Sequence, residues 1–267
     1  MYPVRAKKHL GQHFLNDENI AQRITESITL PCASLLEIGP GTGVLTKYLL
    51  KLYIPGCTSD NTGAISEFLA LDVDRESISY LKTTYPQFSQ IFKEADFITF
   101  NPLDYFKGCF TVIGNFPYNI SSQIFFKILD HVDLVTEVVC MLQKEVAERI
   151  AAPPGSKTYG ILSVLLQAWY DIEYLFTVSE HVFIPPPKVK SAVIRLKRNS
   201  TTGLGCDPLL FKQVVKTAFN QRRKTLRNAL KSINLAPSPT LDKLLELRAE
   251  RLSVADFVYI TNQVSAV

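Results

Sequence analysis

A glycine-rich loop near the N-terminus has the composition of a cofactor-binding turn. Residues 35–43 are LLEIGPGTG, a short apolar run that ends in glycines, and residues 44–50 continue with helical spacing. This pattern predicts a strand, a tight turn and a helix, where glycine lets the backbone approach a ligand and the helix offers unpaired N–H groups. Such turns serve NAD, FAD and S-adenosylmethionine alike, and some are only strand-to-helix connections.

Two details of this loop favour S-adenosylmethionine. Gly39, Gly41 and Gly43 follow the spacing Gly-x-Gly-x-Gly, whereas dinucleotide-binding loops have Gly-x-Gly-x-x-Gly. Glu37 precedes the loop, where its charge would repel a pyrophosphate. The sequence therefore predicts a sulfonium cofactor at this turn.

A second candidate for chemistry is the segment formed by Asn115, Phe116, Pro117 and Tyr118. Pro117 favours an extended Phe116, whose carbonyl can then point into a cleft beside the Asn115 side-chain oxygen. Two such acceptors suit a planar exocyclic amine, because they would orient its nitrogen toward an electrophilic methyl without a strong base. Tyr118 adds a ring face on which a base can stack. A plain turn is the alternative for this segment.

Carboxylates follow two further predicted strands. Asp72 and Asp74 come at the end of an apolar run, where nucleotide-binding α/β folds commonly hold ribose hydroxyls. Either of them could instead cap the next helix. Asp96 follows the third predicted strand, placed to accept from an adenine amino group, with Phe97 able to pack on the ring.

Strand and helix patterns alternate along the chain, which predicts an α/β fold that positions these groups. Asn16 or Asp17 is expected to cap a first helix that runs to about Ile28. The polar residues 55–63 predict a surface loop. The predicted strands cover residues 35–38, 68–71, 88–92, 109–114, 134–142 and 191–196, and later helices cover residues 143–151 and 158–169.

Length and composition fit an ordinary globular protein. With 267 residues, 46% of them hydrophobic, the chain can bury a full core and suits one large domain plus a small one. The five cysteines form no Cys-x-x-Cys pair, so neither a metal nor a disulfide framework is indicated. The apolar runs are too short for a signal peptide or a membrane span, and we expect a cytoplasmic protein.

Positive charge is concentrated toward the C-terminus. The net charge is only +4, yet residues 211–231 contain seven Lys or Arg and no acidic residue. This balance suggests a polyanionic partner, although a basic helix can also be just a solvated face. The polar, flexible residues 199–205 mark a domain boundary, which predicts domains at 1–199 and 200–267.

Five segments together resemble the KsgA-type ribosomal RNA adenine dimethyltransferases, over essentially the whole chain. The most specific are NFPYNISS at residues 115–122 and FIPPPKVKSA at residues 183–192. The others are GQHFL at residues 11–15, EIGPGTG at residues 37–43 and the strand end at Asp96. The resemblance implies S-adenosylmethionine-dependent dimethylation of N6 on two adjacent adenines in the hairpin near the 3′ end of small-subunit ribosomal RNA. It also implies a Rossmann-like, mostly parallel seven-stranded sheet with a reversed last hairpin and a small all-helical C-terminal domain.

The resemblance also implies roles for particular residues. Phe183 and Tyr118 would sandwich a flipped adenine, beside the catalytic Asn115, Phe116 and Pro117. Asp72 departs from the family pattern, which commonly has Glu here, and its arm is shorter by one methylene. The implied cofactor-binding residues are His13, Leu15, Gly39, Gly41, Asp72, Asp96 and Asn115.

With a nucleic-acid-methylating domain attached, the basic segment is expected to contact the RNA backbone. The expected partner is small-subunit RNA in a pre-30S particle, with a role in subunit biogenesis for a monomeric protein that uses no metal. Two alternatives stay open: a large-subunit adenine methylase of the antibiotic-resistance type, and a non-catalytic assembly factor on the same fold. A dinucleotide-dependent oxidoreductase is disfavoured by the glycine spacing. The predicted RNA contacts are Arg222, Arg223, Lys224 and Arg227.

Overall fold

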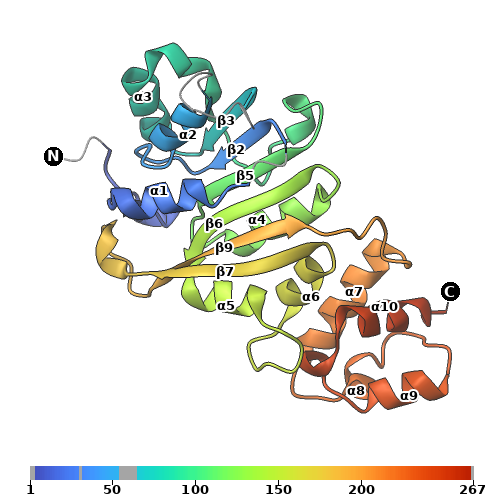
Figure 1. Ribbon diagram of the computed structural model, residues 1–267. Coiled ribbons are helices and arrows are strands. Elements are labelled where there is room, and N and C mark those ends of the chain that lie inside the picture. Colours follow the sequence, from blue (N-terminus) through green and yellow to red (C-terminus); the bar gives the residue numbers. More distant parts are fainter. Residues whose placement is uncertain (1–3, 30–31, 54–64, 266–267) are drawn as a thin grey trace. The chain divides into compact units, whose positions relative to one another are not determined.

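A computed structural model describes residues 4–29, 32–53 and 65–265 (Figure 1). The loop predicted at residues 55–63 lies outside the described residues. The chain divides into two compact units, Met1–Ala147 with Glu173–Arg198, and Glu148–Ile172 with Asn199–Val267.

The predicted α/β fold is confirmed, with one seven-stranded sheet in the order β4-β3-β2-β5-β6-β9-β7. A separate two-stranded sheet pairs β1 with β8. The strands of the large sheet are β2 (Ser34–Ile38), β3 (Glu67–Asp72), β4 (Phe92–Glu94), β5 (Phe110–Asn115), β6 (Val135–Gln143), β7 (Tyr170–Val178) and β9 (Ser191–Arg198); the small sheet has β1 (Phe14–Leu15) and β8 (Phe183–Ile184).

Helices connect the parallel strands and complete the second unit. Asp17 caps α1, its side chain accepting from the Ile20 N–H at 3.0 Å, so Asp17 rather than Asn16 is the cap. The α-helices are α1 (Glu18–Glu26), α2 (Thr46–Tyr53), α3 (Arg75–Thr84), α4 (Ser121–Asp130), α5 (Lys144–Ala151), α6 (Ile161–Gln167), α7 (Pro208–Asn220), α8 (Leu226–Ala229), α9 (Pro239–Leu245) and α10 (Val254–Asn262).

The centre of the sheet is parallel. β2 lies between β3 and β5 and runs parallel to both, with Leu36 opposite Leu69 on one side and Val112 on the other. β6 is parallel to β5 and antiparallel to β9, so the sense of the sheet reverses there, as expected. Because parallel strands end at the same edge of a sheet, the loops after β2, β3 and β5 meet.

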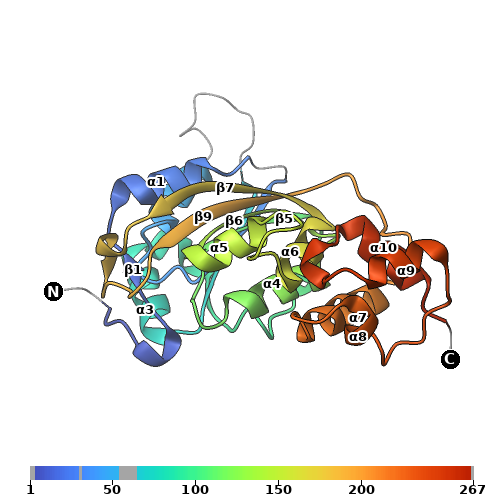
Figure 2. The same ribbon diagram turned by 90° about the horizontal axis from the view of Figure 1, so that it is seen from below.

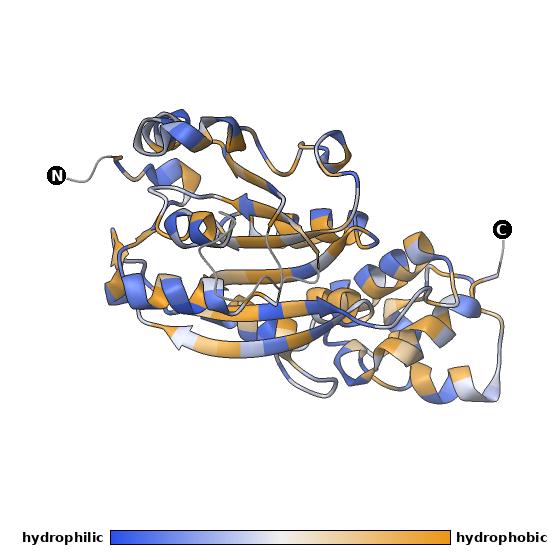
Figure 3. Cartoon of the chain, turned by 45° about the horizontal axis from the view of Figure 1, so that its top comes forward, coloured by the Kyte–Doolittle hydropathy of each residue, from blue (hydrophilic) through white to orange (hydrophobic). Residues whose placement is uncertain are grey.

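Both faces of the sheet are covered, which explains its apolar strands (Figure 3). Side chains alternate along each strand, and Leu35, Ile113 and Val139 pack on one face against residues of α1, α2 and α3. Figure 2 shows α1 and α4 on opposite sides of the sheet.

Two strand predictions differ from the structure. Residues 86–91 form a short 3₁₀ helix that starts at Pro86, and β4 begins only at Phe92, where pairing with Ala70 of β3 starts. The predicted strand at residues 88–92 was therefore placed too early. No strand was predicted at β7, which forms the edge of the sheet beside β9.

The second unit has its own aromatic core. The rings of Phe219 and Phe257 are stacked with centroids 6.0 Å apart, and Tyr159 lies 6.3 Å from Phe219. Residues 148–172, which sequence analysis assigned to the first domain, belong to this unit, since α6 packs against α7 and α10.

In the described ranges, no helix has the length and apolarity needed to cross a bilayer.

Gly114 provides a test of the sheet centre. A Cβ atom at this position would lie 2.3 Å from the Ile38 carbonyl oxygen, a backbone atom that cannot rotate away. We expect Gly114→Ala to lower the free energy of unfolding by about 1–3 kcal/mol in urea denaturation, the range of overpacked cores. Gly108→Ala is the matched control, because a Cβ there meets nothing within 4 Å. Equal stability of the two variants would contradict the close approach of β2 and β5.

Candidate active site

A pocket opens at the carboxyl ends of β2, β3 and β5, where the strand order of the sheet changes direction. It measures about 660 Å³ including its open side, and the N-terminal residues 10–15 form another wall. The sequence-predicted residues that line it are His13, Leu15, Gly39, Gly41, Asp72, Asn115, Phe116, Pro117 and Tyr118.

Glu37 lines the pocket with an incompletely paired carboxyl group. Its Oε2 accepts a 2.8 Å hydrogen bond from the Thr46 hydroxyl, whereas Oε1 is buried without a hydrogen-bond partner among the described residues. Burial raises the pKa of Glu37 to about 8, against the Thr46 hydrogen bond, which lowers it, and the Asp72 charge raises it further. A cationic donor on a ligand would satisfy this oxygen and favour the ionised form.

Asp72 joins the end of β3 to the glycine loop. Its Oδ2 accepts from the Gly41 N–H at 3.1 Å, and its Oδ1 accepts from the Asp74 N–H at 2.9 Å. Burial raises the pKa of Asp72 to about 6, although both backbone hydrogen bonds lower it. Asp74, and not Asp72, caps α3 through the Glu76 N–H, so the two strand-end carboxylates have different roles.

Asn115 ends β5 with its side chain held by one contact. Its Nδ2 donates to the His13 carbonyl at 3.0 Å, which orients the amide. Across the described ranges no donor reaches Oδ1, so this oxygen is available as an acceptor. The neighbouring Phe116 N–H donates to the Met141 carbonyl at 2.9 Å, and the Phe116 ring is buried. The turn after β5 is thus held by the N-terminal segment through Asn115 and by β6 through the Phe116 backbone.

Tyr118 lies at the junction with a second pocket, which measures about 960 Å³ including its open side. Its ring stacks on His13, with centroids 5.4 Å apart and an interplanar angle of 29°. The Tyr118 hydroxyl is hydrogen-bonded to the Ser191 hydroxyl, and burial raises the pKa of the phenol. Residues shared by the two pockets are Gly11, Gln12, His13 and Tyr118, and the prolines Pro185, Pro186 and Pro187 line only the second.

The segments that line the pockets are evident in the sequence, but several of their individual contacts are not. Phe14 packs against Gly41, and a Cβ there would lie 2.9 Å from the Phe14 ring. The His13 imidazole Nδ1 lies 2.8 Å from the Pro185 carbonyl oxygen, and Ser191 holds Tyr118. The signals were present in the GQHFL and FIPPPKVKSA segments, but pairing them requires the fold.

Asp96 and Phe183 lie outside both pockets. The Asp96 side chain is exposed and accepts from the Ile98 N–H at 2.9 Å, while Phe97 is buried and offers no free ring face. Phe183 is 1% exposed in the core, because β8 pairs with β1 and turns this ring inward opposite Leu15. A sandwich of a base between Phe183 and Tyr118 therefore has no support in the described structure.

The four predicted RNA contacts, all in the second unit, differ in their surroundings. Arg227 is paired with Asp242 at 3.3 Å and Glu246 at 2.9 Å, which raises its pKa. Arg222 donates to the Lys157 carbonyl and lies 3.8 Å from Glu250. Arg223 and Lys224 are exposed and form no ion pair with any described residue, so their charge is uncompensated.

Comparison with known proteins gives full-length matches. Residues 4–264 match the family model described as ribosomal RNA adenine dimethylase. A protein from Cytophaga hutchinsonii, named ribosomal RNA small subunit methyltransferase A, is 56% identical, covering 99% of this chain and 99% of its own. Proteins of the same name from Bacteroides fragilis and Flavobacterium johnsoniae are 56% and 51% identical, with 98% and 100% of this chain covered and 93% and 98% of theirs.

Solved structures agree with the fold. A dimethyladenosine transferase from Plasmodium falciparum superposes with a TM-score of 0.74 at 25% identity, covering 93% of this chain and 96% of its own. The 23S ribosomal RNA methyltransferase ErmE gives a TM-score of 0.68 at 22% identity, covering 94% and 100%, which indicates a shared fold.

The buried Glu37 carboxyl predicts a pH dependence of stability. Its pKa rises on folding from the ordinary 4.5 to about 8, so the folded state holds the proton more tightly than the unfolded state. The resulting stabilisation is complete below pH 4.5 and is lost as the pH rises through about 8. Glu37→Gln does not titrate there, so the stability of the wild type relative to this variant should fall across that interval.

Urea denaturation at several pH values measures this difference. Asp72, with a pKa of about 6, titrates in both proteins and serves as an internal control. Stability curves that stay parallel from pH 4.5 to about 8 would contradict a protonated Glu37 in the ligand-free protein.

Proposed function

Because the chain belongs to the ribosomal RNA adenine dimethylase family, we propose that it dimethylates two adjacent adenines in the 3′-terminal hairpin of small-subunit ribosomal RNA. It is an adenine dimethyltransferase that uses S-adenosylmethionine. Relatives at 51–56% identity carry the small-subunit name, which favours this substrate over a large-subunit adenine. The observation that carries the proposal is the junction of two pockets at His13 and Tyr118, beside the Asn115 amide.

The first pocket has a donor and acceptor set that fits S-adenosylmethionine. The unpaired Oε1 of Glu37 suits an ammonium group, which is the kind of cation that this buried carboxyl lacks. We assign Glu37, Gly39 and Asp72 to hold the cofactor. His13 and Leu15 form the wall beside it, through their backbone and apolar atoms. When bound, S-adenosylmethionine supplies a methyl group activated by a sulfonium sulfur.

Asn115 then acts on the adenine that receives the methyl group. Its amide nitrogen is engaged with His13, so its oxygen faces the remaining space and can accept an N–H of the adenine N6 amine. An amide is no useful base near neutral pH, so its role is to orient the amine and not to remove its proton before transfer. The Phe116 carbonyl, followed by Pro117, is proposed as the second acceptor.

The second pocket is proposed to receive the flipped adenine. Tyr118 is already stacked on His13, so the base has the other face of the phenol ring available. The hydrogen bond between the Tyr118 and Ser191 hydroxyls fixes this ring, and burial, which raises the pKa of the phenol, keeps it neutral. The proline-rich residues 185–187 form the facing wall in place of Phe183, and Asp96 is left with no assigned cofactor contact.

We assign phosphate binding to the C-terminal domain proposed at residues 200–267, which is part of the second unit. Arg223 and Lys224 are the best candidates, because a cation that is already paired with carboxylates neutralises a phosphate poorly and so displaces few of the counterions condensed on the RNA. We further propose that the protein is a cytoplasmic monomer that acts on RNA within an assembling small subunit.

Asn115→Ala tests the orientation of the amine. Losing one preorganised polar contact should lower the single-turnover rate of methyl transfer by roughly two to three orders of magnitude. The measurement uses radiolabelled cofactor, unmodified small subunits and mapping of the modified nucleotides. Cofactor and RNA affinities, measured separately by calorimetry and filter binding, should change much less.

The product distribution of this variant gives a second readout. Monomethyladenine has one N–H left to be held, so a variant that accumulates the monomethyl product would support orientation by two acceptors. Dimethylation at a near wild-type rate, with normal cofactor and RNA binding, would defeat the assignment.

Replacing Arg223 and Lys224 with Gln tests the RNA contacts. Each lost phosphate contact should flatten the dependence of log affinity on log salt by about 0.7–0.9. Arg227→Gln is the matched control, since Asp242 and Glu246 already balance its charge and the slope should stay the same. Cofactor affinity should be unaffected in both proteins. An unaltered salt slope in the double variant would show that this basic segment is only a solvated surface.

A further inference from the structure

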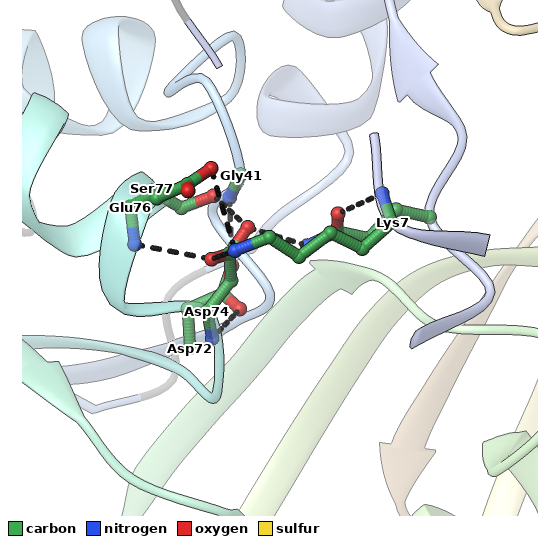
Figure 4. A network of polar contacts seen from close by, with 7 residues as sticks. Lys7, Gly41, Asp72, Asp74, Glu76 and Ser77 are labelled. Atoms are coloured by element: carbon green, nitrogen blue, oxygen red, sulfur yellow. Dashed lines mark hydrogen bonds and ion pairs between the residues drawn. The ribbon is translucent and has the colours of Figure 1, made fainter. Parts of the chain in front are cut away.

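One polar network near the active site has no role in the proposed reaction. The Asp74 carboxylate, inaccessible to solvent, accepts hydrogen bonds from four groups (Figure 4). Two are local and cap α3: the Glu76 N–H at 3.0 Å and the Ser77 hydroxyl at 3.1 Å. The other two come from the far N-terminus, the Lys7 ammonium at 2.5 Å and the Gln12 amide at 3.1 Å. A helix cap needs only the first two.

Lys7 and Gln12 also fix each other. The Gln12 side-chain oxygen accepts from the Lys7 N–H at 2.9 Å, so the same amide bridges the backbone of the segment and the carboxylate. Burial alone would raise the pKa of Asp74, but the hydrogen bonds from Lys7, Gln12, Glu76 and Ser77 outweigh it and lower the pKa. The carboxylate therefore stays ionised, and its attraction for Lys7 persists at neutral pH.

The segment tied down in this way is a wall of the active site. Residues 10–15 line the first pocket, and the His13 carbonyl accepts from Asn115 Nδ2. The Asp74 N–H in turn donates to Asp72 Oδ1, which leaves Asp72 Oδ2 for Gly41. Asp74 thus connects the N-terminal wall, through its side chain, to the end of β3 and the glycine loop, through its backbone N–H and Asp72.

We propose that Asp74 is a positioning residue for methyl transfer, which holds Lys7 and Gln12 so that the His13 carbonyl orients the Asn115 amide. The carboxylate touches neither reactant. Its effect is transmitted along residues 7–13, and its consequence for the reaction rests on the proposed function. Without the ion pair between Lys7 and Asp74, the N-terminal segment keeps its apolar contacts but no longer holds the His13 carbonyl in place. The Asn115 amide is then free to rotate.

The direct test observes the Asn115 amide in the ligand-free protein. The wild type with ¹⁵N-labelled asparagine should show a protected Asn115 side-chain NH₂, assigned with Asn115→Ser. Lys7→Met should raise its hydrogen-exchange rate by about tenfold or more, and Lys7→Arg should restore protection because it keeps the charge. Asp74→Asn should behave like Lys7→Met, since asparagine remains a good helix cap.

The chain offers a matched control in Lys47→Met. Lys47 forms an ion pair of the same length, 2.5 Å, with Glu18, and neither residue lines the pocket. This variant should leave the hydrogen-exchange rate of the Asn115 amide and the rate of methyl transfer unchanged. In single-turnover assays Lys7→Met and Asp74→Asn should lose roughly 10- to 100-fold in rate, the scale of a small misplacement of reacting groups, with RNA affinity unchanged.

The outcomes separate this inference from the proposed function. An Asn115 amide as protected in Lys7→Met and Asp74→Asn as in the wild type would overturn the positioning role, even if Asn115→Ala abolishes methylation. Equal loss in Lys7→Met and Lys47→Met would also overturn it, because the effect would then be one of net charge. Loss of protection in both variants with rescue by Lys7→Arg supports it, whatever RNA the enzyme modifies.

Discussion

β2 and β5 run side by side, and no side chain at Gly114 keeps the two backbones apart. This pairing brings the glycine loop after β2 and the Asn115 turn after β5 to one edge of the sheet, where the strand order changes direction. The first pocket opens at that edge. The N-terminal segment closes it from outside through His13, and Asp72 joins it to β3.

Electrostatics within the site follows from burial. Glu37 and Asp72 line a pocket that contains neither Lys nor Arg, and burial raises the pKa of both carboxyl groups. Asp74, two residues further on, has a lowered pKa because Lys7 reaches it. The two neighbouring carboxylates at the end of β3 thus have different roles. Asp72 lies on the ligand side of the glycine loop, and Asp74 anchors the N-terminal segment that covers the pocket.

Local patterns in the sequence predicted what depends on local chemistry. The glycine loop, the turn at Asn115 and the cap at Asp17 are each specified by a few adjacent residues, and most strands by apolar runs. β7 was missed because its exposed and half-buried residues alternate irregularly at a sheet edge. The strand predicted at residues 88–92 was placed too early because Pro86 starts a 3₁₀ helix, and β4 begins only at Phe92. Phe183 is buried through its long-range pairing with β1, which no local pattern reveals.

The composition of the second unit bears on the order in which the chain leaves the ribosome during its own synthesis. α6 buries Leu162 and Leu166 on one side, yet its partners α7 and α10 are made only after β7 and β9. The sheet of the first unit can thus be completed while the apolar side of α6 still lacks its cover. For that interval the nascent chain exposes a hydrophobic helix surface, the kind of surface that chaperones bind.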